Sequence, residues 1–370
     1  MSSILWNGMG RLRDIREEES VPVYLDALVE EGKVPGVQYL VVDSANVIFE
    51  YAGGCADVAG QRPMNRSTTL MAYSMSKTIT AAAVLRLVDE GALTLNDPIT
   101  RYVASTPSRS ATIGQLLTHT GGVPHPIPLR WVHLVQEHAT FDEAAALAKQ
   151  LERSAHKFAA PGEKYRYSNL GYWLLGPTVE AVSGQLFATY VCEQVLSPLG
   201  ISKSELSYTI PDASNHATGY LEKYSFLNLV KRLVLDRKFI GHYEGRWLEI
   251  VAHYVNGPAF GGLVGNSRGF GKFLQDQLRP RSRLFGDTTR ALMRRAAQTS
   301  NDAEIPMTHG WQIGSLDDIR CLYKEGGGGG FHCIMRMYPE RGIGTVVMTN
   351  ATVFDVGALL ALLDRRFLAV

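Results

Sequence analysis

The two ends of this chain carry β-strand patterns, whereas its middle is mainly helical. Short apolar runs bounded by turn residues predict strands over residues 36–42, 47–51, 311–313, 331–337 and 344–348. Helical patterns dominate from residue 68 to about residue 194, and another helix is predicted over 356–367. Because the strands lie near both termini, we expect one sheet built from the two ends of the chain, with the helical part inserted between them.

The composition excludes several classes of function. The 370 residues are 45% hydrophobic and 20% charged, as expected for a soluble globular protein of one or two domains. The net charge of +1, without a basic block, gives no indication of nucleic-acid binding. No apolar run approaches the roughly 18 residues of a membrane span. The charged N-terminus also lacks the apolar core of a secretory signal.

Cysteine and histidine spacing predicts no metal site. The four cysteines, at positions 55, 192, 321 and 333, have no metal-binding or redox spacing. The ten histidines form no H-E-x-x-H motif. We therefore expect a cytoplasmic protein with reduced thiols, without a metal or other cofactor.

The sequence S-M-S-K at residues 74–77 is the strongest chemical signal. It begins a run over residues 74–93 whose apolar residues recur at helical spacing. Residues three apart share a helix face, so Lys77 can reach the hydroxyl of Ser74. A serine hydroxyl needs a base beside it to become a nucleophile, and a lysine can serve if burial or a nearby charge lowers its pKa. Ser74 and Lys77 are thus a candidate nucleophile and base.

A second S-x-x-K match, S-A-H-K at residues 154–157, has a different context. It ends a charged helix and is followed within a few residues by Pro161 and Gly162, which stop a helix. We interpret Ser154 as a surface residue without a catalytic role.

Two further motifs carry groups suited to acyl chemistry. Tyr167, in Y-S-N at residues 167–169, can relay a proton if a lysine lowers its pKa, and Asn169 can orient Lys77 and a substrate carbonyl. Lys324, Glu325 and Gly326 precede four more glycines, and a backbone N–H there can serve an oxyanion hole. Taken singly, the first motif also fits a loop tyrosine that caps the core, and the second fits a flexible surface hairpin.

In this order the three motifs resemble those of the serine β-lactamase and penicillin-recognising superfamily, in particular class C β-lactamases and family VIII carboxylesterases. The resemblance extends over roughly residues 30–350. It is carried by Y-S-M-S-K-T at 73–78, L-L-T-H-T-G-G at 116–122, P-G-E-K-Y-R-Y-S-N at 161–169, P-L-G at 198–200 and K-E-G at 324–326.

The resemblance implies an α+β, β-lactamase-like fold. An antiparallel sheet flanked by helices would be formed by residues 1–67 and 258–370. A mainly helical domain would be formed by residues 68–257, and the active site would lie in the cleft between the two domains.

The resemblance also implies a role for each motif residue. Ser74 would be acylated, Lys77 would be its base, and Tyr167 would carry the proton to and from the leaving group. The substrate-binding residues would be Asn169, Lys324, Glu325 and Gly326, with Lys324 also supporting the tyrosine. The N–H groups of Ser74 and Gly327 would form the oxyanion hole. Whether lysine or tyrosine takes the first proton stays open.

Glu325 departs from the family pattern, which has Thr or Ser at this position. That hydroxyl helps to hold the carboxylate of a β-lactam or of a peptide C-terminus, whereas a glutamate would repel a carboxylate and partly neutralise Lys324. We therefore expect a carboxylesterase whose partner is a small neutral ester rather than a penicillin or peptide. A β-lactamase or D-amino-acid peptidase is the alternative within the superfamily.

Other functions also fit parts of the sequence. An acyltransferase of secondary metabolism would pass the acyl group from Ser74 to an alcohol or amine. A non-enzymatic binding protein fits poorly, because all the motif residues are retained. The sequence G-N-S-R-G at 265–269 matches the nucleophile elbow of α/β-hydrolases, with Asp287 or Asp302 and His309 or His332 to complete a triad. The helical stretch before it argues against that fold, and we interpret Ser267 as a helix N-cap.

Two features stay open as binding or structural elements. Residues 224–250 combine apolar and basic side chains, which predicts a packed helical region with a solvated basic face or a lid over an acyl pocket. His119, in the T-H-T-G-G turn, is interpreted as structural. The sequence does not indicate the oligomeric state.

Overall fold

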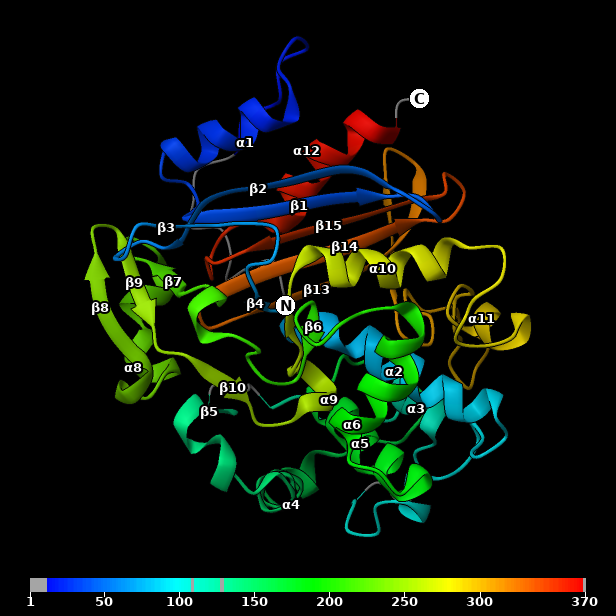
Figure 1. Cartoon of the computed structure of the whole chain (residues 1–370). Coiled ribbons are helices and arrows are strands. Elements are labelled where there is room, and N and C mark those ends of the chain that lie inside the picture. The colour runs from blue at the N-terminus through cyan, green and yellow to red at the C-terminus, as the bar shows by residue number, and fades with distance from the viewer. Residues whose placement is uncertain (1–11, 108–109, 127–129, 369–370) are drawn as a thin grey trace.

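The computed structural model describes residues 12–107, 110–126 and 130–368. At its centre is a seven-stranded sheet in which all neighbouring strands are antiparallel (Figure 1). The spatial order is β12 (Gln312–Leu316), β13 (Ile319–Gly328), β14 (Phe331–Tyr338), β15 (Ile343–Thr349), β1 (Gly36–Val42), β2 (Val47–Asp57) and β3 (Arg62–Pro63). The predicted α+β fold, with a sheet formed from both ends of the chain, is confirmed.

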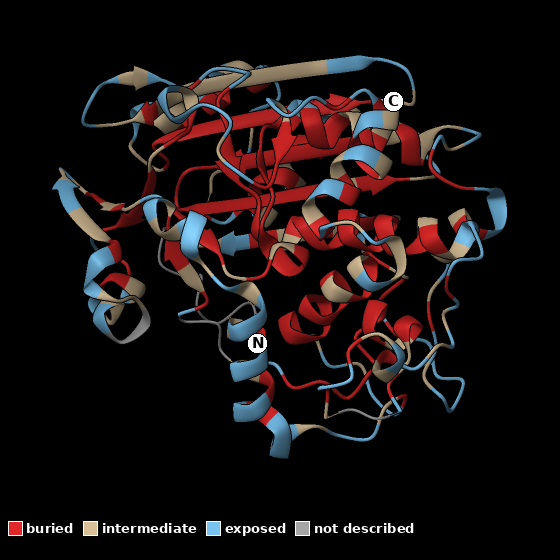
Figure 2. Ribbon diagram, turned by 60° about the horizontal axis from the view of Figure 1, so that its bottom comes forward, coloured by how far each residue is buried: buried red, intermediate tan, exposed pale blue. Residues whose placement is uncertain are grey.

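Helices cover both faces of this sheet, so its central strands are buried (Figure 2). Successive residues of a strand point to opposite faces. On β1, Tyr39 therefore packs with α1 (Val21–Glu30) and α12 (Val356–Leu368), whereas Leu40 faces α10 (Ser267–Leu278). An antiparallel sheet covered on both faces needs continuous apolar runs rather than alternation, which is why these strands were detectable in the sequence.

The segment between the two halves of the sheet is mainly helical. Its longer helices are α2 (Ser76–Asp89), α4 (Glu143–Ser154) and α5 (Asn169–Ser183), and its shorter ones are α3 (Ile113–Leu117), α6 (Phe187–Val191), α7 (Phe226–Leu229), α8 (Lys231–Val234) and α9 (Pro258–Gly261); α11 (Asp287–Leu292) follows α10. Helix α2 is shorter than the predicted run over 74–93, because Ser74 belongs to a separate 3₁₀ turn and Gly91 has the left-handed φ of +70° typical of a helix end. Within the described ranges, every helix is too short or too polar to cross a bilayer.

Three small sheets accompany these helices. They are β4 (Leu70–Met71), β11 (Val264–Gly265) and β6 (Leu206–Ser207); β5 (Val132–Leu134) and β10 (His253–Val255); and β7 (Gly219–Glu222), β9 (Trp247–Ile250) and β8 (Ile240–Glu244). The predicted helical region over 224–250 is wrong. It contains the single-turn helices α7 and α8 followed by the β8–β9 hairpin, because pairing of β9 with β7 outweighs a weak helical preference.

A buried carboxylate joins α12 to the sheet. Asp364 accepts hydrogen bonds from Tyr338 (2.6 Å), Thr345 (3.2 Å) and Tyr39 (3.3 Å), and it lies 3.6 Å from the guanidinium of Arg336. Burial raises the pKa of Asp364 to about 6, while Arg336 acts in the opposite direction. The last helix is thus held to three strands by one side chain.

We expect Asp364→Ala to lower the free energy of unfolding by about 3 kcal/mol, because it leaves the hydroxyls of three residues without their acceptor and the largely buried Arg336 without its counter-charge. Chemical denaturation measures the loss. Asp317→Ala is the matched control, because it removes an exposed ion pair to Arg365 on the same helix and should cost under about 1 kcal/mol. Equal decreases in the free energy of unfolding for the two variants would contradict the role of Asp364 in holding α12 to the sheet.

Candidate active site

Ser74 lies in a short 3₁₀ turn, Tyr73–Met75, between β4 and α2. Tyr73, the residue before it, has a φ of +44°, which is rare for a residue with a side chain and costs roughly 1–3 kcal/mol. Its hydroxyl donates to the carbonyl of Gly329 (2.7 Å) and lies 2.9 Å from Nε2 of His253. These contacts hold the turn in a conformation that the chain would otherwise avoid.

Lys77 and Tyr167 converge on the hydroxyl of Ser74. Lys77 Nζ and Tyr167 Oη each lie 2.9 Å from Ser74 Oγ and donate to it in this arrangement. Lys77 reaches it from one turn along, as the spacing predicted. A second hydrogen bond, 2.6 Å long, joins Lys77 Nζ to the carbonyl oxygen of Phe260. The predicted contact from Asn169 to Lys77 is absent among the described residues, and the backbone of α9 orients Lys77 instead.

Burial alters the acid–base properties of the three groups. Lys77 is fully buried, and this desolvation, together with the nearby charge of Lys324, holds the Lys77 pKa well below its ordinary value. Burial also lowers the pKa of Lys324 to about 7, partly offset by Glu325. Burial raises the pKa of Tyr167, while its hydrogen bond to Ser74 lowers it. A neutral amine at Lys77 beside a protonated tyrosine suits transfer of the serine proton.

Lys324 also lies close to Tyr167. Its Nζ is 5.0 Å from the centre of the Tyr167 ring, and Lys77 Nζ is 5.2 Å from the same ring. Among the described residues, Lys324 Nζ is buried without a hydrogen-bond partner. It is thus placed to act on Tyr167 through its charge.

The first three glycines of the run, 326–328, belong to strand β13, and the last two form its tight turn into β14. A Cβ on Gly326 would lie 2.2 Å from the carbonyl oxygen of Ala72 and 2.8 Å from the amide nitrogen of Ser74. A Cβ on Gly328 would lie 2.4 Å from the ring of Tyr73. Glycine is therefore required where β13 packs directly against the turn that carries Ser74.

One edge of this strand segment is open. Strand β12 pairs with β13 only as far as Tyr323, opposite Gln312. In the described chain, no strand pairs with residues 324–328 on that side. Backbone groups near Gly327 can therefore meet a substrate at Ser74.

Glu325 and Asn169 lie at different edges of the site. Glu325 is 2.7 Å from Nε2 of His332, whose Nδ1 is 2.6 Å from the carbonyl of Phe354. By strand alternation it faces away from Lys324 and Gly326. Asn169 begins α5, and its Oδ1 is buried without a partner among the described residues, so it is available to a ligand.

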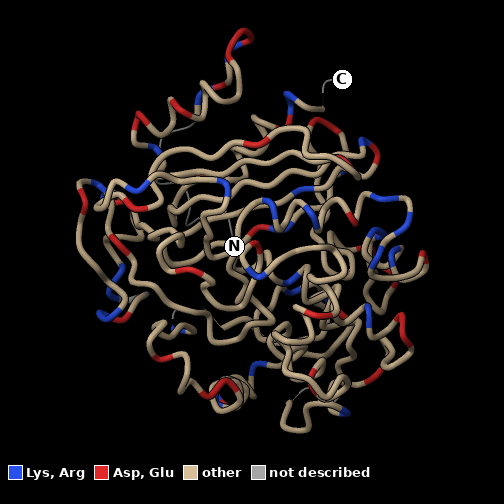
Figure 3. The backbone as a smooth tube through the Cα atoms, viewed as in Figure 1, with Lys and Arg blue, Asp and Glu red and all other residues tan. Residues whose placement is uncertain are grey.

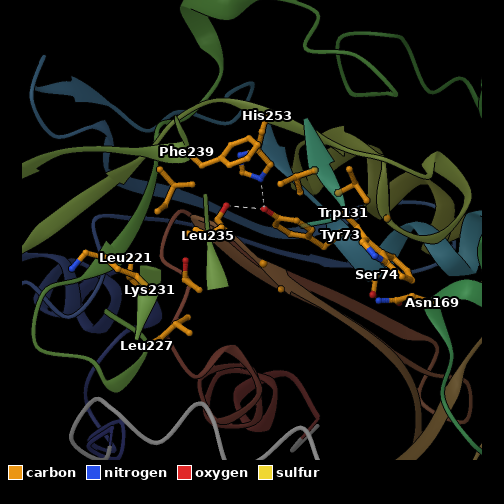
Figure 4. A pocket seen from close by; sticks show the side chains of 18 of the residues that line it. Tyr73, Ser74, Trp131, Asn169, Leu221, Leu227, Lys231, Leu235, Phe239 and His253 are labelled. Atoms are coloured by element: carbon orange, nitrogen blue, oxygen red, sulfur yellow. Dashed lines mark hydrogen bonds between the residues drawn. The ribbon is translucent and has the colours of Figure 1, made fainter. Parts of the chain in front are cut away.

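A cavity of about 230 Å³ adjoins Ser74 (Figure 4). Its lining is mostly apolar and comes from several elements: Tyr73, Ser74, Trp131, Val132, Asn169, Leu221, Leu227, Lys231, Leu235, Phe239, Ile250, His253, Val255, Phe260, Gly261, Gly327, Gly328, Gly329 and Thr352. Glu325 is not among these residues. The apolar pattern over residues 224–250 predicted part of the cavity wall. No sequence pattern predicted that Trp131 lines the cavity or that the carbonyl of Phe260 contacts Lys77.

The competing serines lie elsewhere. Ser267 is the first residue of α10, and the predicted N-cap role is wrong by one residue, because Asn266 provides the capping side chain. His309 and His332 contact the backbone of Leu292 and Phe354 rather than Ser267. The antiparallel sheet also differs from that of an α/β-hydrolase.

The interpretation of Ser154 as a surface residue is also wrong. It is only 3% exposed, because it shares the inward face of α4 with Leu147 and Leu151.

His119 contacts the Tyr167 loop. Its ring centre lies 4.4 Å from that of Tyr167, its Nδ1 accepts from the amide of Ser168 (3.2 Å), and its carbonyl accepts from the amide of Arg166 (2.8 Å). Burial holds the pKa of His119 well below its ordinary value, so it is neutral. These contacts position the loop and support the structural interpretation.

Residues 24–367 match the Beta-lactamase family, so the chain belongs to that family. The predicted superfamily resemblance is confirmed. The protein Flp of Staphylococcus aureus (strain MW2) is 27% identical over 209 residues. These residues are 55% of this chain but only 41% of Flp, so the match spans less than half of that relative.

Solved structures share the fold over most of the chain. The octameric penicillin-binding protein homologue from Pyrococcus abyssi has a TM-score of 0.76 at 21% identity, covering 94% of this chain and 76% of that one. EstCE1, described as a hydrolase with promiscuous acyltransferase activity, has a TM-score of 0.67 at 21% identity, covering 92% and 95%. At these identities the structures show the fold alone.

The packing of β13 predicts that Gly326→Ala destabilises the protein by about 1–3 kcal/mol, because the added methyl group overlaps backbone atoms of the Ser74 turn. Denaturation measures this. Gly357→Ala in α12 is the control, because its Cβ would meet only an ordinary contact 3.5 Å away. If Gly326→Ala is as stable as the control variant, β13 does not pack closely against the Ser74 turn.

Proposed function

We propose that this protein is a carboxylesterase that cleaves small neutral esters through an acyl-enzyme on Ser74. The observation that carries the proposal is the position of Ser74 Oγ. It lies 2.9 Å from both Lys77 Nζ and Tyr167 Oη, at one end of an apolar cavity. The site would occupy the cleft between the sheet domain (1–67 and 258–370) and the helical domain (68–257).

In the acylation step, the neutral Lys77 amine or an ionised Tyr167 takes the Ser74 proton while Oγ bonds to the ester carbonyl carbon. The N–H groups of Ser74 and Gly327 stabilise the negative oxygen that forms. The carbon–alkoxide bond then breaks, and the alcohol leaves with a proton delivered through Tyr167. In the second step, water attacks the carbonyl carbon of the acyl-enzyme and gives up a proton to the same base. The bond to Ser74 Oγ then breaks, which releases the carboxylic acid and restores the serine hydroxyl.

The cavity fits the acyl half of the ester. Tyr167, which protonates the departing alcohol, does not line the cavity, whereas Ser74 and Gly327 do. The alcohol therefore leaves on the Tyr167 side, and the acyl group stays in the cavity after the alcohol has gone. Asn169, with its free Oδ1 at the cavity wall, would orient the substrate.

The charges near Ser74 favour neutral esters. The ammonium of Lys324 has the Glu325 carboxylate beside it on the strand, and this raises the Lys324 pKa against the effect of burial. Apart from Lys231, the described lining of the cavity is uncharged when His253, whose pKa is lowered by burial, is neutral. A penicillin carboxylate would find little compensation for its desolvation here.

Acyl transfer is the second candidate, with one supporting observation. EstCE1, whose fold is similar, is described as having promiscuous acyltransferase activity. An apolar site disfavours ordered water, so an alcohol or amine bound near Tyr167 would compete for the acyl-enzyme. β-Lactamase or D-amino-acid peptidase activity ranks below both.

Hydrolysis of p-nitrophenyl acetate tests the nucleophile. We expect Ser74→Ala to lower kcat/KM by at least about 10³-fold, because it removes the hydroxyl that Lys77 and Tyr167 both contact. Ser267→Ala should retain the wild-type rate, since it lies in α10 away from the lysine–tyrosine pair. Loss of activity in Ser267→Ala alone would overturn the proposal.

The pH profile tests the role of Lys324. Its positive charge lowers the pKa of Lys77, so Lys324→Gln should raise the Lys77 pKa and move the acid limb of kcat/KM upward by about one pH unit. Lys164→Gln, an exposed lysine in the Tyr167 loop, should leave the limb in place. A limb that moves to lower pH, or does not move, contradicts electrostatic coupling between the two lysines.

A further inference from the structure

The segment that forms the far wall of the cavity also carries an unusual outer surface. Tyr224 is 76% exposed, Phe226 is 62% exposed and Leu229 is 81% exposed. Monomeric proteins normally leave large apolar side chains exposed singly, whereas three within six residues form a patch. We call Tyr224, Phe226 and Leu229 the apolar patch.

The apolar patch and part of the cavity wall belong to the same short segment of chain, residues 224–235. On α7, Phe226 and Leu229 point outward while Leu227 lines the cavity. On α8, the side chain of Lys231 lines the cavity together with Leu235, which follows the helix. Figure 4 shows Leu227 and Lys231 on the side of the cavity away from Ser74. Only single-turn helices therefore separate the apolar patch from the cavity.

Basic residues flank the apolar patch in the sequence. Residues 223–238 contain five lysines and arginines and one acidic residue. The acidic residue, Asp236, is paired with Arg130, and Lys238 is paired with Glu137. Among the described residues, Arg232 and Arg237 are exposed and make no ion pair. Figure 3 shows lysine and arginine gathered on the segment that Figure 1 labels α8.

We propose that this surface docks on an anionic lipid bilayer and that ester substrates enter the cavity from it. Exposed aromatic and leucine side chains bordered by lysine and arginine are the combination that binds at the interface of anionic membranes. The inference rests on the proposed esterase function for its substrate, but the docking itself does not. It extends that function from soluble esters to water-insoluble ones held in lipid.

A second copy of the chain fits this surface less well. In a symmetric dimer the same patch meets itself. The basic residues of one copy would then face those of the other, and like charges in an interface are unfavourable. A lipid surface supplies the opposite charge and the apolar phase together.

Vesicle flotation tests the docking, using the Ser74→Ala protein so that no lipid is hydrolysed. We expect it to float with vesicles of mixed phosphatidylcholine and phosphatidylglycerol, to bind pure phosphatidylcholine weakly, and to be released by salt. The substitutions F226S/L229S, introduced into the Ser74→Ala protein, should weaken its binding to the anionic vesicles at least about tenfold. The control is V47S/I48S, which removes two other exposed apolar side chains, 52% and 45% exposed, from β2.

Hydrolysis of p-nitrophenyl acetate separates docking from catalysis. Phe226 and Leu229 do not line the cavity, so F226S/L229S in the active protein should keep the wild-type rate. Absent hydrolysis in wild type would defeat the proposed function while leaving the flotation result valid.

Three results would overturn the docking proposal. They are no flotation with anionic vesicles, equal flotation of F226S/L229S and V47S/I48S, or sedimentation showing a dimer that only F226S/L229S dissociates.

Discussion

Two buried lysines near one tyrosine ring determine the acid–base chemistry of this site. Lys77 and Lys324 are both fully buried, and their Nζ atoms lie 5.2 Å and 5.0 Å from the ring centre of Tyr167. A charged amine is unfavourable in such surroundings, so burial lowers the pKa of both lysines, and the nearby charge of Lys324 lowers the pKa of Lys77 further. A lysine that is neutral near neutral pH is what the proposed acylation of Ser74 requires.

This arrangement depends on backbone packing rather than on the lysines themselves. Gly326 and Gly328 bring β13 against the Ser74 turn, and Tyr73 holds that turn in a strained conformation through Gly329 and His253. The strand that supplies Lys324 is thereby fixed to the turn that precedes Lys77. The sheet, with α12 anchored by Asp364, provides the rigid support.

Local patterns in the sequence predicted the parts of the structure that local physics determines. Residues 36–42 form a strand as expected, because a doubly covered strand is apolar throughout. The contact between Lys77 and Ser74 follows from helix spacing alone. The carbonyl of Phe260 gave no signal, because any residue supplies a carbonyl. The segment 224–250 was misassigned because pairing with β7, far along the chain, decides its structure. Glycines that fit a flexible hairpin proved to be sites of close packing, which depends on the partner surface.

The covalent intermediate is the central claim, and mass spectrometry of the acyl-enzyme tests it most directly. Wild-type protein mixed with p-nitrophenyl butyrate and quenched in acid should gain the mass of one butyryl group. Peptide mapping should place that group on Ser74, and the Ser74→Ala protein should gain nothing. A butyryl group on Ser267, or rapid hydrolysis with no acylated protein on Ser74 at any quench time, would contradict the account.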